Sequence, residues 1–136
     1  NDDSFTIIEF VELGLGAKQK YYPLEKVVIN FSENGTYQIN SDLLFNPPKY
    51  NRKKLEKIYA NNNALVEKTG SSTALIPAEV RSLKYLADSY LICYLNGFED
   101  AKEEMERARQ ILKSKYPGIN ASLKEALRVL RKVKYS

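Results

Sequence analysis

The sequence predicts one α+β domain, predominantly α, in which a small N-terminal antiparallel β-meander precedes a bundle of about four helices. Three observations predict this class. The length of 136 residues is that of one ordinary domain with a single core. Residues 1–48 hold aromatic and β-branched runs, whereas residues 49–136 hold helix formers with apolar residues every three or four positions. Six glycines and five prolines are too few for collagen-like or low-complexity chains.

Three strands are predicted in the first third of the chain. Two runs rich in aromatic and β-branched residues have the composition of strands. Asn34-Gly35 follows the second run and predicts a type I′ hairpin turn, because that turn needs two residues that tolerate positive φ. Gly14, Gly16 and Pro23 indicate a loop between the first two strands. The predicted strands cover residues 5–13, 24–31 and 37–40.

Four helices are predicted after Asn46-Pro47-Pro48. Asn51 is the expected N-cap of the first helix, and three consecutive asparagines, residues 61–63, are expected to end it. The second helix is apolar all round in its later turns, which is typical of a helix at the centre of a core. Pro117-Gly118 is expected to break the chain before the last helix, which Asn120 would cap. The predicted helices cover residues 51–61, 77–95, 98–115 and 121–134.

Charge is distributed unevenly between an acidic β-rich part, residues 1–48, and a basic helical part, residues 49–136. The first part carries seven acids and three bases, although the whole chain has a net charge of +4. The last 24 residues hold seven bases and one acid. Such asymmetry is typical of a protein that binds nucleic acid, an anionic membrane face or an acidic protein.

The last predicted helix carries the first candidate binding residues. Leu123, Leu127 and Leu130 lie on its apolar stripe, and bases recur on another face at the spacing of successive helical turns. A ridge of this kind is suited to contacting successive phosphates. The alternative is that bases late in a helix complement its dipole. The candidate residues are Lys124, Arg128, Arg131, Lys132 and Lys134.

The second basic stretch lies at the start of the first predicted helix. Three bases in a first turn oppose the helix dipole, whereas a helix start with free N–H groups and bases suits an anion. Tyr50 adds an aromatic face on which a base could stack. The alternative is that exposed lysines tolerate the small dipole penalty. The candidate residues are Tyr50, Arg52, Lys53, Lys54 and Lys57.

Catalysis, metal binding and cofactors are not expected. The chain has no histidine and one cysteine, which excludes disulfides, His-based triads and Cys/His zinc sites within it. Cys93 falls in the most apolar predicted helix and is expected to be inert core. Glu99, Glu103 and Glu106 share helix faces, but acids at a helix start are ordinarily solvated.

The tyrosines divide into two groups. Tyr85, Tyr90 and Tyr94 fall in the apolar helix and are expected to pack in the core. Others lie in strands, loops or turns near charged residues and are better candidates for contacting a ligand: Tyr21, Tyr22, Tyr37, Tyr50 and Tyr116.

These patterns favour a non-catalytic accessory protein that binds DNA or RNA backbone, as a subunit of a larger nucleic-acid-processing complex. The alternative is a protein–protein interaction module without nucleic-acid contact, which would dock through the strands of the acidic part or through amphipathic helices. A membrane partner is not expected, because the last helix needs its apolar face for the core. A single cysteine in 136 residues favours an intracellular location, although three glycosylation-type triplets point the other way.

Overall fold

The computed structural model describes residues 3–15 and 18–135, except for the side chains of residues 134 and 135. A three-stranded antiparallel sheet, in the order β1-β2-β3, precedes five helices within these ranges. Half of the structure is helical and 26% is strand, so the predicted class is confirmed. The strands are β1 (Ser4–Leu15), β2 (Lys18–Phe31) and β3 (Tyr37–Leu43). The helices are α1 (Arg52–Gly70), α2 (Pro77–Leu83), α3 (Leu86–Leu95), α4 (Ala101–Leu112) and α5 (Pro117–Tyr135).

The first two strands are longer than predicted. Gly14, Leu15 and Pro23 lie inside strands rather than in the predicted loop, and Gly16 is outside the described residues. Glu9 pairs with Glu25, but the next residue, Phe10, pairs with Pro23. The extra residue in β2 makes a β-bulge, where a proline without an N–H is tolerated. The prediction of a loop at Pro23 was therefore wrong because the bulge accommodates the ring.

The turn between β2 and β3 is wider than the predicted type I′ turn. Its strands end at the pair Phe31 and Tyr37, so five residues connect them. Gly35 has a φ of 83°, whereas Asn34 is not among the described residues with positive φ. The Oδ1 atom of Asn34 instead accepts a hydrogen bond from the backbone N–H of Thr36 at 3.2 Å. This side-chain bond closes the turn without a second left-handed residue.

Helix α1 continues well beyond its predicted end. It passes through the three asparagines to Gly70, and its buried residues there include Leu65 and Val66. The hydroxyl of Tyr90 in α3 donates a hydrogen bond to Oδ1 of Asn63 at 2.7 Å. Tertiary packing therefore overrides the weak helix propensity of asparagine.

The long second helix of the prediction is two helices, α2 and α3. Tyr85 separates them with φ −109° and ψ 9°, and no glycine or proline lies at the break to indicate it. Leu83 and Leu86 are both buried at this corner. Helix α3 packs against α1, α4, α5 and β1, which confirms the predicted central helix.

The last two helices differ from the prediction at their ends. Helix α4 covers residues 101–112 rather than 98–115. Helix α5 begins at Pro117 rather than at Ala121, so Asn120 lies inside the helix and does not cap it. Proline is favoured at the first helical position because its missing N–H would lack a partner there anyway. No helix in the described ranges is both long enough and apolar enough to cross a membrane.

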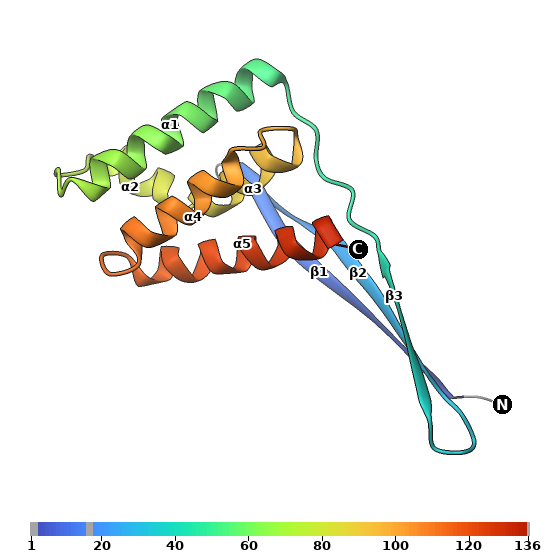
Figure 1. Cartoon of the computed structure of the whole chain (residues 1–136). Helices are drawn as coiled ribbons and strands as arrows, with labels where there is room; N and C mark the ends of the chain where they lie inside the picture. The colour runs from blue at the N-terminus through green and yellow to red at the C-terminus, as the bar shows by residue number, and fades with distance from the viewer. Residues whose placement is uncertain (1–2, 16–17, 136) are drawn as a thin grey trace.

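The sheet has two unlike halves, which we call the base and the arm. The base consists of residues 10–15 and 18–24, and packs on the helices through buried Leu13 and Leu24. Its backbone is also fixed by Asp88 of α3, whose Oδ2 accepts a hydrogen bond from the N–H of Gly14 at 3.3 Å. The arm consists of residues 3–9 and 25–43, and Figure 1 shows it projecting away from all five helices.

Candidate functional site

The start of α1 is already capped. The side-chain Oδ1 of Asn51 accepts hydrogen bonds from the backbone N–H groups of Lys53 at 2.9 Å and Lys54 at 3.4 Å. Asn51 is thus the N-cap that the sequence predicts. Because these two N–H groups have a partner, fewer are free for an anion than the sequence suggested. The absence of acids in the first turn remains the feature that favours a negative ligand.

Two of the predicted cations at α1 contact aromatic rings. The guanidinium carbon of Arg52 lies 4.3 Å from the ring centroid of Phe98, and its Nε is 3.3 Å from a carboxylate oxygen of Glu56. The ammonium of Lys54 lies 5.2 Å from the ring centroid of Tyr50, which packs against the core. Lys54 and the core thus both contact Tyr50, the ring on which a nucleic-acid base was expected to stack.

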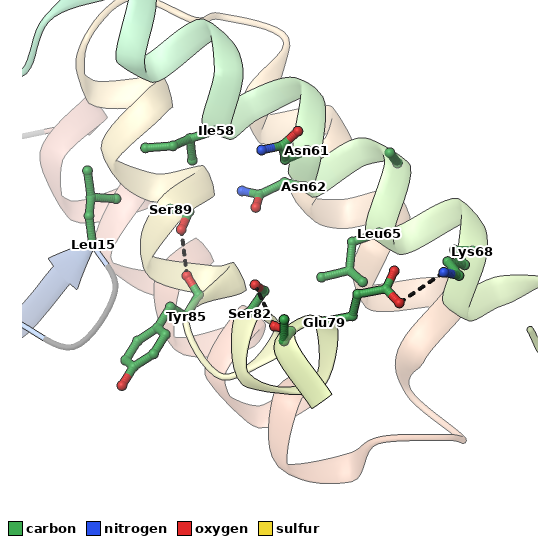
Figure 2. Close-up of a pocket in the computed structure, with 12 residues that line it drawn as sticks. Leu15, Ile58, Asn61, Asn62, Leu65, Lys68, Glu79, Ser82, Tyr85 and Ser89 are labelled. Atoms are coloured by element: carbon green, nitrogen blue, oxygen red, sulfur yellow. Dashed lines mark hydrogen bonds and ion pairs between the residues drawn. The ribbon is translucent and has the colours of Figure 1, made fainter. Parts of the chain in front are cut away.

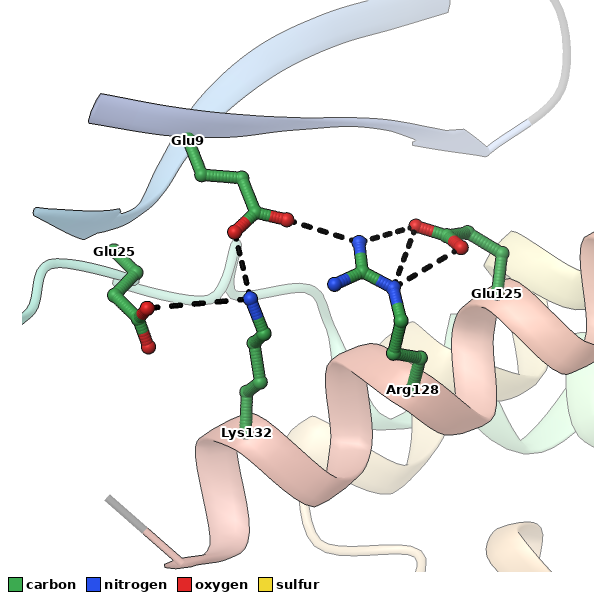
Figure 3. A network of polar contacts seen from close by, with 5 residues as sticks. All are labelled: Glu9, Glu25, Glu125, Arg128 and Lys132. Atoms are coloured by element: carbon green, nitrogen blue, oxygen red, sulfur yellow. Dashed lines mark hydrogen bonds and ion pairs between the residues drawn. The ribbon is translucent and has the colours of Figure 1, made fainter. Parts of the chain in front are cut away.

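Helix α5 does not present its bases as a free ridge. Arg128 binds two carboxylates, with Nη2 2.9 Å from Glu9 of β1 and 2.6 Å from Glu125. Lys132 lies 2.6 Å from the other oxygen of Glu9 and 4.0 Å from Glu25 of β2. Figure 3 shows these five side chains meeting between the sheet and the helix. We call them the ionic cluster.

The ionic cluster neutralises its own cations. Hydrogen bonds from Lys132 and Arg128 lower the pKa of Glu9, and a hydrogen bond from Arg128 lowers the pKa of Glu125. Glu9 and Glu125 are therefore ionised at neutral pH beside Arg128 and Lys132. A cluster with this balance attaches the sheet to α5 and does not attract a polyanion.

The ten predicted residues lie at two places in the helical body, the start of α1 and the later turns of α5. Helices α1 and α5 each pack against both α3 and α4, so the two basic stretches belong to separate helices of the bundle. Arg128 and Lys132 belong to the ionic cluster, and the side chain of Lys134 is outside the described part. Four of the ten are exposed and form neither an ion pair nor a ring contact with a described residue: Lys53, Lys57, Lys124 and Arg131.

A different surface stands out on the arm, where the strand register places seven aromatic and aliphatic side chains on one face, with Asp3 and Ser41 at its edges. Three rows cross the sheet. The ring of Phe31 contacts the rings of Phe5 and Tyr37, with centroids 5.9 and 6.1 Å apart. We call this surface the bare face, and it consists of Phe5, Ile7, Val27, Ile29, Phe31, Tyr37 and Ile39.

The bare face continues the side of the sheet that the helices cover. Val11 and Leu13 of the base, which alternate with outward residues in the same strand, pack into the core. The ionic cluster follows at Glu9, and beyond it the helices end (Figure 1). Phe5 is 61% exposed and Tyr37 is 62% exposed. The opposite face of the arm is more polar, with Thr6, Asn30, Gln38 and Asn40.

The sequence predicts these strands but not that one of their faces lacks cover. Tyr37 is the one member of the bare face that it singled out, and Tyr21 and Tyr116 are also exposed. Tyr22 is partly buried against the core, where its ring meets Phe45. Tyr90 is fully buried, as predicted, and Tyr85 and Tyr94 are partly buried. The alternation of apolar residues predicts the apolar face of these strands, but it gives no signal of what covers that face.

A cavity of about 470 Å³ lies among α1, α2 and α3 (Figure 2). An ion pair at 2.9 Å joins Lys68 and Glu79 at its wall. The hydroxyls of Ser82 and Ser89 donate to backbone carbonyls one turn earlier, at 3.0 and 2.8 Å. Asn62 is buried, and its Nδ2 has no hydrogen-bond partner among the described residues. The cavity thus holds polar groups, but its hydroxyls and its lysine already have partners.

The thiol of Cys93 is shielded from solvent. Cys93 is buried, and burial raises the pKa of its thiol to about 11. A thiol in that state is a poor nucleophile at neutral pH. Within the described ranges, no three acidic or cysteine side chains come close enough together to hold a metal ion. The expectation that the protein is not an enzyme stays a prediction.

Fold and surface together define an α+β protein in which a helical body carries a projecting sheet with one apolar face. The whole chain, residues 1–136, matches the family described as a domain of unknown function, DUF5929, and the protein belongs to that family. No protein with a curated description and no solved structure matches it.

Proposed function

We propose that the protein is a non-catalytic protein–protein interaction module whose docking surface is the bare face of the arm. The observation that carries this proposal is the exposure of an aromatic and aliphatic sheet face. Contiguous apolar patches of this kind are typical of interaction sites. Aromatic side chains supply much of the binding energy at such sites because they bury large areas with few rotatable bonds.

Charge favours a protein over a nucleic acid as the occupant of this face. Exposed aromatic rings on a sheet can stack on bases, but nucleic-acid sites pair such rings with cations. The arm lies in the acidic part of the chain, and exposed Asp3 lies beside Phe31 at the edge of the bare face. A polyanion would therefore be repelled, whereas a neutral apolar protein surface would not. An intracellular location fits this proposal, because the single buried cysteine forms no disulfide within the chain.

Site-specific photo-crosslinking tests the proposal. A photoreactive phenylalanine analogue is placed at Tyr37 on the bare face, or at the neighbouring exposed Gln38 on the opposite face, in the cells that make this protein. We expect a discrete protein adduct from position 37 and a much weaker one from position 38. Adducts from neither position, or equal adducts from both, would contradict a docking role for this face.

Nucleic-acid backbone binding is a second candidate function, favoured by the start of α1. Lys53 and Lys57 are exposed, lie one helical turn apart, and have no acid beside them in the first turn. With Lys124 and Arg131 they offer up to four phosphate contacts, so the log–log salt slope on duplex DNA would be about −3 to −4.

Salt-titrated binding to single-stranded and duplex probes tests this second candidate. Lys53→Glu with Lys57→Glu should weaken binding and flatten the salt slope. Lys20→Glu, an exposed lysine of β2, is the matched control and should leave both nearly unchanged. A wild-type slope near zero would remove this candidate.

A further inference from the structure

We infer that the occupant of the bare face is a second copy of this chain, packed face to face with the two arms antiparallel. The inference rests on the proposed docking role of that face and names its partner. The dimer would be a small β-sandwich of two three-stranded sheets related by a two-fold axis.

Two copies of the bare face are chemically compatible with each other. None of its seven residues carries a charge, and the charged side chain in its rows, Asp3, lies at the edge of the sheet beside Phe31. Glu9 and Glu25 at the border are already paired with Arg128 and Lys132, so a charged partner would gain no ion pair from them. A partner of a different kind would therefore need to be equally flat, neutral and apolar. The chain itself provides one surface of this description.

The rows of the bare face also fit an antiparallel copy. The middle row consists of Phe5, Ile29 and Ile39, and a two-fold axis along it faces each of these residues with its own copy. The row of Phe31 and Tyr37 then meets the row of Ile7, Val27 and Ser41 in the other copy, with Phe31 opposite Val27 and Tyr37 opposite Ser41. Large and small side chains interdigitate across such an interface, as in the core of a β-sandwich.

The helical bodies allow this arrangement. Helix α5 reaches the sheet at the ionic cluster, so a copy can approach only beyond Glu9. Figure 1 shows all five helices at one end of the arm. In an antiparallel pair each body lies beyond the tip of the other arm, whereas a parallel pair would place the two bodies side by side.

The area of the bare face sets the strength of the dimer. From typical aromatic side-chain areas and the exposed fractions of its residues, each copy contributes on the order of 500 Å². Two copies then bury roughly 1,000 to 1,200 Å², the low end for specific interfaces. We therefore expect a reversible dimer whose population depends on concentration.

Sedimentation velocity from about 1 to 200 µM tests the dimer by mass action. The wild type should shift from 15.6 kDa toward twice that mass as concentration rises. Ile7→Thr with Ile39→Thr should raise the dimer Kd at least about tenfold, since both lie on the bare face. Ile8→Thr with Asn40→Thr is the matched control, because these next residues of the same strands face the other way. It should change Kd less than about twofold.

Chemical crosslinking tests the same dimer through proximity rather than affinity. Cysteine replaces Ile29 on the axis row, or Val28 on the opposite face, and a bis-maleimide with a reach near the roughly 10 Å spacing of packed sheets is added. We expect dimer from Ile29→Cys and background from Val28→Cys. Buried Cys93 should react slowly in both.

A wild type that stays monomeric at the highest concentration, or equal crosslinking from both positions, would overturn the dimer. In that case a photo-adduct at position 37 with another protein would still support the docking role of the face. If neither a dimer nor a photo-adduct at position 37 is found, both the dimer and the proposed function are contradicted.

Discussion

The base and the arm are two halves of one sheet, yet different forces hold them. In the base, Leu13 and Leu24 are buried against the helices and Asp88 binds the backbone of β1. In the arm, the same side of the sheet continues with apolar residues that no helix covers (Figure 1). A β-strand pattern therefore predicts an apolar face but does not show whether that face is buried within the chain or offered to another one.

The largest expected effect is in the base. Leu24→Ala should lower the free energy of unfolding by about 2 to 5 kcal/mol, because Leu24 is fully buried and its removal leaves a cavity. Urea denaturation at low protein concentration measures this. A loss below about 1 kcal/mol would mean that the base is not a fixed part of the core.

The border between the halves should respond to pH. Glu9→Gln should cost about 1 kcal/mol at neutral pH, because it removes the charge that Arg128 and Lys132 share. The folded-state pKa of Glu9 is lowered, so its contribution is full above the unfolded value, near 4.5, and is lost as pH falls through the folded value. Urea midpoints of wild type and variant should therefore converge in acid. A difference that does not depend on pH would contradict the ionic cluster.

The effect of Asp88 on stability should change with pH in the opposite direction from that of Glu9. Burial raises its pKa, so the ionised carboxylate costs stability at neutral pH, and this cost disappears as pH falls below the unfolded value. Asp88→Asn keeps an oxygen for the N–H of Gly14, and should gain up to about 1 kcal/mol at neutral pH and nothing in acid. Asp88→Leu removes the acceptor and should instead destabilise the protein. The same urea series measures both variants.

The smallest expected effect is in the arm. Ile39→Thr should change the free energy of unfolding of the monomer by less than about 0.5 kcal/mol, because Ile39 is 55% exposed and threonine suits a strand. Urea denaturation at a concentration well below the dimer Kd measures this. A large loss there would mean that the bare face is buried within the monomer, and the contrast with the base would fail.

Several features of the fold follow from local sequence. Aromatic and β-branched runs predict the strands, Asn51 predicts the start of the first helix, and the apolar run around Cys93 predicts the central helix. These predictions succeed because the physical cause lies within a few residues of the effect. The predicted end of the first helix at Asn61 is wrong because Asn63 packs against α3 and the helix continues. The predicted start of the last helix at Ala121 is wrong because Pro117 takes the first helical position.

The candidate site was less predictable than the fold. The bases of α5 were read as a ridge, but Arg128 and Lys132 are paired with Glu9, which is more than one hundred residues away in the chain. Their exposure could not be predicted from spacing, because helical periodicity says which residues share a face and not what that face meets.

The amino-acid sequence by itself determined the class of fold, the acidic and basic division, the absence of histidine and the apolar character of the strands. Only the tertiary structure decided which charges cancel and which apolar face stays uncovered. The physical reason is range: propensity and periodicity act over one or two turns, whereas burial and ion pairing depend on elements that meet only once the chain has folded.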